Sequence, residues 1–214
     1  MTEGMLKILI ADDHAIVREG LKQILSEVPD MVVAGEAASG TEAMDLVRRE
    51  PWSLVLLDIS MPGKSGLDVL KQIKDEYPRL PVLMLSMYPE DQYAVRVMKS
   101  GASGYLTKES APELLVTAIR KVANGGKYIS PSLAESLACA LNSDLDKPLH
   151  QTLSNREFEI LRLLASGRTV SQIGEQLALS VKTISTYRAR ILEKLHMESN
   201  AELTHYAVKN HLVD

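Results

Sequence analysis

The stretch Leu54-Val55-Leu56-Leu57-Asp58 decides how this chain folds. Four consecutive apolar residues are typical of a strand that is buried on both faces, and such strands occur in parallel sheets covered by helices. The loop residues 59–63 follow, with proline at 62 and glycine at 63. Asp58 is therefore predicted at the carboxyl end of a central strand, which is where open α/β sheets carry their binding sites.

The rest of residues 1–126 repeats this strand pattern and alternates it with helical periodicity. Apolar runs predict further strands at residues 7–11, 31–35, 82–85 and 104–107. Apolar residues at helical spacing predict helices at residues 15–27, 40–49, 67–77, 94–101 and 111–124. Five strands that alternate with five helices predict an α/β doubly wound five-stranded parallel sheet.

Polar side chains stand at the ends of four of these predicted strands. Asp12 and Asp13 follow the first strand, and the other ends carry Asp58, Ser86 and Lys108. In a parallel sheet all carboxyl ends lie along one edge, so these side chains should converge. Carboxylates suit a hard cation such as Mg²⁺, while an ammonium and a hydroxyl suit phosphoryl oxygens. The residues by themselves leave Asp58 as either a metal ligand or a nucleophile toward phosphorus.

Length and composition limit the class of protein. The 214 residues are long for one domain and sufficient for two, and 45% hydrophobic residues support ordinary cores. No apolar run approaches the roughly 20 residues of a membrane span, and the first residues lack a cleavable signal pattern. We therefore expect a cytoplasmic protein without a membrane partner. The single cysteine, Cys139, excludes an internal disulfide framework and a cysteine-built zinc site.

Residues 127–150 interrupt the alternating pattern and are predicted to be a linker. Ser130 followed by Pro131 is typical of a helix start, and Leu133, Leu137 and Leu141 form a stripe at helical spacing. This pattern predicts a short linker helix. The residues from 142 to 151 are predicted to be a flexible connection.

Residues 151–214 are predicted to form an all-α four-helix domain. Ser154 and Glu157 fit a capping box at the start of the first helix, and Ser180 fits an N-cap after a tight turn. The predicted helices span residues 154–165, 170–177, 181–195 and 199–210. Two helices joined by a short turn, the second one carrying cations, indicate a helix-turn-helix DNA-binding domain.

The predicted third helix of this domain has two distinct faces. Ile184, Tyr187, Ile191 and Leu195 form its apolar stripe. The other face is polar and cationic. Such a face can enter the major groove of double-stranded DNA, where side chains reach base edges. The residues expected to contact DNA are Lys182, Thr183, Ser185, Thr186, Arg188 and Arg190. Residues 148–214 hold eight Lys and Arg against seven Asp and Glu, so the net charge of this segment is a weak signal. The positions of the individual charges are more informative about DNA binding.

The pattern over residues 6–126 resembles the receiver domain of bacterial two-component response regulators, which has a flavodoxin-like fold. The residues that carry the resemblance are Asp12-Asp13, Asp58 with Met61-Pro62-Gly63, Ser86, Tyr105 and Lys108. The resemblance implies that Asp58 accepts a phosphoryl group from a cognate sensor histidine kinase. It also implies that Asp13, Asp58 and the backbone carbonyl of Ser60 hold Mg²⁺, with Asp12 acting mainly through water.

The same resemblance implies how the phosphorylated state is sensed. Ser86 would move toward the phosphoryl group, and Tyr105 would turn inward behind it. Glu109 is a departure, because many receivers have proline after the lysine. This departure puts only the geometry of that loop in doubt.

The C-terminal pattern resembles the LuxR-type helix-turn-helix. The residues that carry it are Leu153-Ser154-Asn155-Arg156-Glu157, Ile173, Leu177, Ser180, Thr183-Ile184, Tyr187, Ile191 and Lys194-Leu195. Together the two halves resemble NarL/FixJ-class response regulators, and most closely a GacA-like branch. Ser185 and Thr186 stand where many relatives have a cation, and Gly174 replaces a common alanine at a cost of up to about 1 kcal/mol in helix propensity. The sequence gives no reason for Gly174.

Two functional hypotheses follow from these patterns. The favoured one is a phosphorylation-controlled transcription regulator that binds promoter DNA. The alternative is a haloacid-type phosphatase, which also uses an aspartyl nucleophile, a lysine and Mg²⁺. That enzyme class needs alternating aspartates after its first strand, whereas Asp12 and Asp13 are adjacent.

The last predicted helix suggests a homodimer that phosphorylation or DNA would favour. Leu203, Tyr206 and Ala207 lie on one predicted face that the domain core can bury. A second, mildly apolar face is a candidate dimer interface and consists of Ala201, Thr204, Val208 and Leu212. The alternative is that Val208 and Leu212 pack back on the linker.

Overall fold

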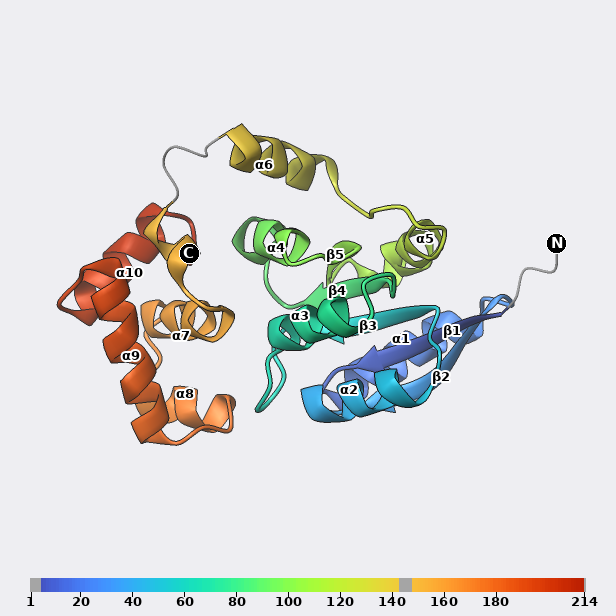
Figure 1. Cartoon of the computed structure of the whole chain (residues 1–214), viewed down its shortest axis with the longest axis horizontal. Coiled ribbons are helices and arrows are strands. Elements are labelled where there is room, and N and C mark those ends of the chain that lie inside the picture. The colour runs from blue at the N-terminus through green and yellow to red at the C-terminus, as the bar shows by residue number, and fades with distance from the viewer. Residues whose placement is uncertain (1–4, 143–147, 214) are drawn as a thin grey trace. The chain divides into compact units, whose positions relative to one another are not determined.

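A computed structural model describes residues 5–142 and 148–213 (Figure 1). The chain divides into two compact units, Met1–Ala134 and Glu135–Asp214. The division falls inside α6 (Pro131–Asn142) and within the predicted linker. In the described part of the chain, no helix combines the length and apolar character needed to cross a bilayer.

The first unit is the predicted doubly wound sheet. Its strands are all parallel and lie in the order β2-β1-β3-β4-β5. The strands are β1 (Leu6–Ala11), β2 (Met31–Ala37), β3 (Leu54–Asp58), β4 (Val82–Ser86) and β5 (Gly104–Thr107). The helices are α1 (Ala15–Ser26), α2 (Gly40–Arg49), α3 (Gly66–Glu76), α4 (Glu90–Lys99) and α5 (Ala111–Ala123). This strand order places the topological switch point, where the order of the strands reverses, between β1 and β3.

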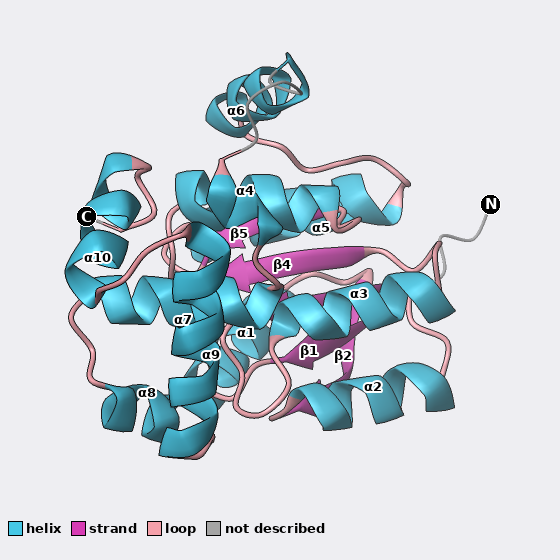
Figure 2. Ribbon diagram, turned by 60° about the vertical axis from the view of Figure 1, so that its left-hand side comes forward, coloured by secondary structure: helices cyan, strands magenta, loops and turns pink. Residues whose placement is uncertain are grey.

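Helices cover both faces of this sheet (Figure 2). α1 and α5 pack on one face, where their apolar residues join those of the central strands in a single buried cluster. α2, α3 and α4 lie on the other face. All five residues of β3 are buried, as the uninterrupted apolar run predicts, because this strand is covered on both faces.

The predicted linker helix is present as α6. Its Leu133 is buried and Leu137 is half-buried, while the side chain of Leu141 lies outside the description. The prediction of a flexible connection up to residue 151 is wrong at its end. Residues Leu149–Thr152 form the one-turn 3-10 helix η1, which is held because the Tyr206 hydroxyl bonds both the His150 backbone N–H and Nδ1.

The second unit contains the predicted helices. They are α7 (Asn155–Ala165), α8 (Val170–Gln176), α9 (Val181–Leu195) and α10 (Asn200–Lys209). The capping box predicted at Ser154 and Glu157 forms, and Ser180 caps α9 by accepting from the Thr183 backbone N–H. Leu203 and Ala207 of α10 are fully buried, so the predicted inner face of this helix is confirmed.

Leu212 does not belong to the second face of the last helix, contrary to the prediction. α10 ends at Lys209, and His211 adopts a left-handed backbone with φ of 54°. The Leu212 N–H then donates to the Ala207 carbonyl and the His211 N–H to the Val208 carbonyl, which is the bonding pattern of a Schellman turn. This turn carries Leu212 into the interior, where it is 5% exposed.

Candidate functional site

The acidic residues of β1 and β3 meet at the carboxyl edge of the sheet. Asp12 and Asp13 follow β1, and Asp58 is the last residue of β3. One ligand atom from each of these three residues and from His14 lies within 4.8 Å of all the others. The reversal of strand order between β1 and β3 opens this edge, so the cluster sits where doubly wound sheets bind ligands.

Lys108 directly follows the end of β5 and completes the cluster. Its Nζ lies 2.7 Å from Asp12 Oδ2 and 2.9 Å from Asp58 Oδ2. The Lys108 backbone N–H donates to the Ser86 carbonyl at 2.7 Å, which continues the pairing of β5 with β4 and fixes the lysine. Lys108 therefore contacts Asp12 and Asp58 directly, and Asp13 has a ligand atom within 4.8 Å of theirs, so these residues converge as strand direction predicts.

Burial dominates the electrostatics of this site. Asp12 and Asp58 are almost fully inaccessible to solvent. Burial raises the pKa of Asp58 to about 6, against the Lys108 charge, which lowers it, and with the Asp12 charge, which raises it further. Burial works to lower the pKa of Lys108, but the Asp58 and Asp12 carboxylates raise it overall. Asp58 is thus an unusually basic carboxylate that is still mostly ionised at pH 7.

The donor set fits a divalent oxygen-seeking cation. Asp12 Oδ2, Asp13 Oδ1 and Asp58 Oδ2 are buried carboxylate oxygens, and each forms an ion pair with Lys108 or His14. Three carboxylates beside one ammonium leave negative charge that a dry site tolerates poorly. A hard cation such as Mg²⁺ would neutralise it.

The loop after β3 is held by a glycine that sequence reasoning missed. The Gly66 N–H donates to the Ile59 carbonyl at 2.9 Å, which closes the loop next to Asp58. A Cβ built on Gly66 would lie 1.8 Å from the Asp58 carbonyl oxygen. The start of α3 can approach the carboxyl end of β3 only because this residue has no side chain.

Ser86 and Tyr105 meet at the backbone of Tyr88. Ser86 Oγ accepts from the Tyr88 N–H at 3.0 Å, and the Tyr105 hydroxyl donates to the Tyr88 carbonyl at 2.6 Å. The Tyr105 side chain is fully buried, while its turn on phosphorylation, which the receiver resemblance implies, stays a prediction. Ser60 contacts the site through its backbone N–H, which bonds the Asp58 carboxylate.

The start of the linker helix is tied to α4. Ser132 Oγ donates to the Glu90 carboxylate at 3.0 Å, and Ser130 Oγ bonds the same oxygen. Ser130 Oγ also accepts from the Leu133 N–H at 3.1 Å, so it caps α6. The sequence signalled this cap but not its carboxylate partner, because the two lie 40 residues apart.

Two charged side chains, Lys194 and Arg156, join helices within the second unit. Lys194 Nζ donates to Glu157 Oε2 at 2.7 Å and joins α9 to the start of α7. Burial would raise the pKa of Glu157, but the Lys194 and Ser154 bonds lower it overall. Arg156 bonds Glu159 at 2.6 Å and the Leu177 carbonyl at 3.2 Å, which holds α7 against the end of α8. The orientation of α9 is therefore fixed by its own domain.

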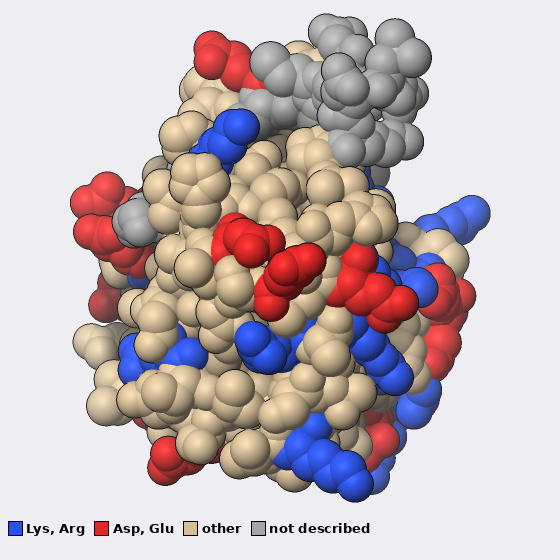
Figure 3. Space-filling view, turned by 90° about the vertical axis from the view of Figure 1, so that its left-hand side faces the viewer, with Lys and Arg blue, Asp and Glu red and all other residues tan. Residues whose placement is uncertain are grey.

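The predicted DNA face of α9 is largely open to solvent. Lys182, Ser185, Thr186 and Arg190 are exposed, whereas Thr183 is half-buried beside Ser180. Arg188 is partly covered because its Nε donates to Asn200 Oδ1 at 2.6 Å. The view in Figure 3 has cationic and acidic side chains interspersed, not one basic patch. The positive charge of this face is therefore carried by individual side chains of α9.

Gly174 has a structural reason that the sequence did not reveal. Its carbonyl accepts from the Leu179 N–H at 2.8 Å, inside the turn between α8 and α9. A Cβ on Gly174 would lie 2.8 Å from the Leu179 carbonyl oxygen, so alanine would force this turn to move. The glycine accommodates a tight turn in which Ala178 has a positive φ of 52°.

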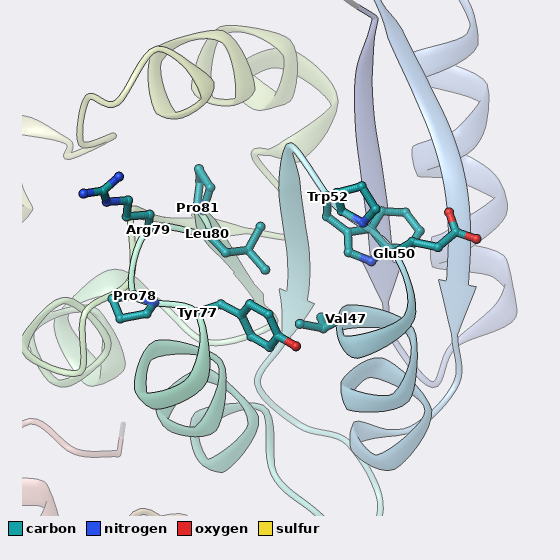
Figure 4. A pocket seen from close by; sticks show the side chains of 9 residues that line it. Val47, Glu50, Trp52, Tyr77, Pro78, Arg79, Leu80 and Pro81 are labelled. Atoms are coloured by element: carbon teal, nitrogen blue, oxygen red, sulfur yellow. The ribbon is translucent and has the colours of Figure 1, made fainter.

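A separate apolar pocket lies at the opposite edge of the sheet (Figure 4). The loops that precede β3 and β4 line it with the side chains of Trp52, Tyr77, Leu80 and Pro81. None of the predicted site residues borders it.

Comparison with known proteins matches both halves of the chain. Residues 8–120 match the response regulator receiver domain, and residues 151–207 match the luxR family of bacterial regulatory proteins. The chain is 36% identical to the response regulator UvrY of Escherichia coli strain K12 over 209 residues, which are 97% of this chain and 96% of UvrY. It is 38% identical to the response regulator GacA of Pseudomonas aeruginosa over 212 residues, which are 98% and 99% of the two chains. A solved structure of two RcsB dimers bound to two parallel DNAs is similar with a TM-score of 0.59 and 29% identity, and covers 95% of this chain and 98% of RcsB.

Proposed function

Since this chain belongs to the response regulators with a LuxR-type DNA-binding domain, we propose that Asp58 is the phosphoacceptor of a phosphorylation-controlled transcription regulator. The observation that carries the proposal is the ion-pair contact of Lys108 with both Asp58 and Asp12 at the end of a fully buried strand. The family gives no support to the alternative of an aspartyl phosphatase. The relatives include GacA, in line with the expected branch.

The proposed reaction is a transfer between two side chains. A carboxylate oxygen of Asp58 forms a bond to phosphorus while the bond from phosphorus to the donor imidazole breaks, and the departing histidine keeps the electron pair. Lys108 and Ser86 stabilise the charge on the phosphoryl oxygens. Asp12, Asp13, Asp58 and the Ser60 carbonyl are the proposed Mg²⁺ ligands. The cation would supply the charge that lets a phosphoryl group approach these carboxylates.

The proposed donor is the phosphohistidine of a cognate sensor kinase. Two large apolar side chains that are close in sequence to site residues are exposed, Ile16 by 88% and Met87 by 72%. Ile16 is near the start of α1, directly after the aspartate loop, and Met87 follows Ser86. A docked kinase would cover both side chains and exclude water from the reaction.

Lys108 is proposed to connect phosphorylation to output, together with Ser86 and Tyr105. When the Ser86 hydroxyl turns toward a phosphoryl group, it gives up its hydrogen bond from the Tyr88 N–H. The Tyr105 hydroxyl is bonded to the carbonyl of the same residue, so the change reaches Tyr105. Lys108→Ala should still be phosphorylated by acetyl phosphate but should lose the gain in DNA affinity, a coupling that is typically about 5- to 150-fold. Parallel measurements of the phosphorylated fraction and of DNA affinity check this. Lys71→Ala, an equal charge change on the exposed face of α3, is the control and should respond as wild type does.

If Lys108→Ala is phosphorylated and its DNA affinity then rises as in the parent, Lys108 has no role in coupling phosphorylation to DNA binding. Loss of phosphorylation itself would show that the transfer step cannot proceed without the charge of Lys108.

The second unit is proposed to bind double-stranded promoter DNA through α9. Such a regulator acts where the DNA is, so a cytoplasmic location remains our prediction. Lys182, Arg188 and Arg190 are proposed to contact phosphates, since long cations neutralise backbone charge. The shorter Thr183, Ser185 and Thr186 are proposed to lie near base edges in the major groove.

Alanine variants should separate these two kinds of contact. Each of Lys182→Ala, Arg188→Ala and Arg190→Ala should weaken specific and nonspecific binding together. Each should flatten the salt dependence by about 0.9 in the logarithmic slope for each lost phosphate contact. Ser185→Ala/Thr186→Ala should change the preferred sequence more than the affinity. Binding titrations at several salt concentrations measure the first effect, and selection of bound sequences from random DNA measures the second. An unchanged sequence preference would show that other residues recognise the bases.

We propose that the active form is a homodimer held in part by the outer face of α10. Ala201 and Val208 are exposed there, Val208 by 48%, and Thr204 is partly exposed. Without Leu212 this face is smaller than predicted, so the association should be weak and should need DNA or phosphorylation. Twofold symmetry would require inverted half-sites about 10 base pairs apart.

Val208→Asp tests this interface. A carboxylate pair at a twofold contact is repulsive, so cooperative binding to two half-sites should fall by about tenfold or more, while single half-site affinity and phosphorylation persist. Sedimentation and gel shifts measure these quantities, and Val208→Thr, which keeps the shape without the charge, is the control. If the phosphorylated aspartate variant still dimerises as the parent does, the interface lies elsewhere.

A further inference from the structure

His14 is part of the acidic cluster, although neither the sequence patterns nor the proposed function uses it. Its Nδ1 lies 2.8 Å from Asp13 Oδ1 and 3.3 Å from Asp12 Oδ1. The side chain is 60% exposed, so the ring closes the cluster from the solvent side. The imidazole is the one nitrogen ligand among the four side chains whose ligand atoms lie within 4.8 Å of one another.

The backbone around His14 holds the ring in this place. The His14 N–H donates to Asp12 Oδ1 at 2.9 Å, and its carbonyl accepts from the Val17 and Arg18 N–H groups at the start of α1. Arg18 Nη1 also donates to the Asp12 carbonyl at 2.7 Å. The position of His14 is therefore set on both sides, by the aspartate loop and by the helix.

Helix capping does not account for the His14 side chain. His14 is the N-cap residue of α1, but its side chain makes no capping hydrogen bond. Asp12 supplies the local carboxylate acceptor instead. The imidazole is directed to Asp13 and Asp12, where its contact has the spacing of neighbouring metal ligands.

That spacing agrees with octahedral coordination. Ligand bonds of about 2.1 Å at right angles place adjacent ligand atoms about 3 Å apart. The two distances from His14 Nδ1 to the carboxylate oxygens, 2.8 and 3.3 Å, bracket this value. A cation shared with Asp12 and Asp13 would lie between the His14 ring nitrogen and these carboxylates.

We propose that His14 Nδ1 is a further ligand of the divalent cation and shifts this site from Mg²⁺ toward first-row transition metals. The inference rests on the proposed function, because it needs the aspartate cluster to be a metal site. Mg²⁺ prefers oxygen ligands and gains little from an imidazole, whereas Ni²⁺, Co²⁺ and Zn²⁺ bind imidazole well. His14 is thus a residue that determines metal specificity.

The test compares metal affinities of the full-length chain and its His14→Asn variant. Asparagine keeps a polar atom near the Nδ1 position but offers oxygen. Calorimetric titration should give a dissociation constant for Ni²⁺ that rises at least about tenfold in His14→Asn, while that for Mg²⁺ changes less than about threefold. Pulsed electron paramagnetic resonance of bound Mn²⁺ should detect directly bound ¹⁴N in the parent and not in His14→Asn.

Two further variants make the outcomes decisive. His205→Asn, an exposed histidine of α10, should leave both metals and the ¹⁴N signal unchanged. Asp58→Asn should weaken both metals, and if it weakens neither, the proposed metal site itself fails. If Asp58→Asn behaves as expected but His14→Asn affects both metals equally, affects neither, or keeps the ¹⁴N signal, the role of His14 is overturned and the metal site stands.

Discussion

Asp58→Asn is expected to abolish stable phosphorylation of the chain. The substitution keeps the volume of the side chain but removes the only nucleophile that the proposal contains, so the rate of phosphoryl transfer should fall by more than about 10⁴-fold. The intact mass of the protein after exposure to acetyl phosphate and Mg²⁺ measures this directly. Asp13→Asn is the comparison, because it removes a proposed metal ligand and keeps the nucleophile. Undiminished phosphorylation of Asp58→Asn would place the phosphoacceptor elsewhere.

The same variant should be more stable than the parent when metal is removed. The pKa of Asp58 is raised to about 6, so its carboxyl group adds stability only while protonated. That contribution is present below about pH 4 and is lost as the pH rises through 6. The neutral asparagine avoids the loss, which amounts to up to about 3 kcal/mol. In chelator, the thermal unfolding temperature of Asp58→Asn should therefore be higher than that of the parent at pH 8, and the two should be nearly equal near pH 4.

Gly66→Ala is expected to be among the most disruptive single changes in the first unit. The added Cβ would lie 1.8 Å from the Asp58 backbone oxygen, and the obstacle is backbone that no side-chain rotation can clear. Either the loop after β3 or the start of α3 must move, at a cost of about 3 kcal/mol or more. Because Asp58 is the residue displaced, phosphorylation should fall in the fraction that still folds. Denaturant unfolding and phosphorylation by acetyl phosphate measure the two effects.

Gly20→Ala is the matched control. Gly20 lies inside α1, and a Cβ there meets nothing within 4 Å. Replacing glycine by alanine in a helix should stabilise the chain by up to about 1 kcal/mol. If Gly66→Ala is as stable as Gly20→Ala and is phosphorylated normally, the close approach of α3 to β3 is not needed.

Much of the site followed from the sequence because strand ends in a parallel sheet share one edge. The pair Asp12-Asp13, Asp58 and Lys108 come from three distant places in the chain, yet a periodicity argument is sufficient to bring them together. The capping box at Ser154 was equally predictable, since both of its partners lie within one helical turn.

Other features depend on close approach between elements and leave no local pattern. Gly66 and Gly174 read as ordinary glycines until the backbone that faces them is known. The left-handed His211 ends α10 early, although histidine is not the usual residue for such a turn, and this reverses the orientation expected for Leu212. The partner of Ser130 is Glu90 in α4, which no spacing within the linker could indicate.

The most direct test of the central claim is the change in DNA affinity when the phosphoryl donor is added. Genomic footprinting would first supply a bound fragment with two half-sites. Fluorescence anisotropy would then give the dissociation constant of the full-length chain for that fragment, with Mg²⁺, before and after acetyl phosphate, for the parent and Asp58→Asn. We predict tighter binding after phosphorylation of the parent and no change in the variant. An equal response of the two proteins, or none in a parent whose mass confirms phosphorylation, would contradict the control of DNA binding by Asp58.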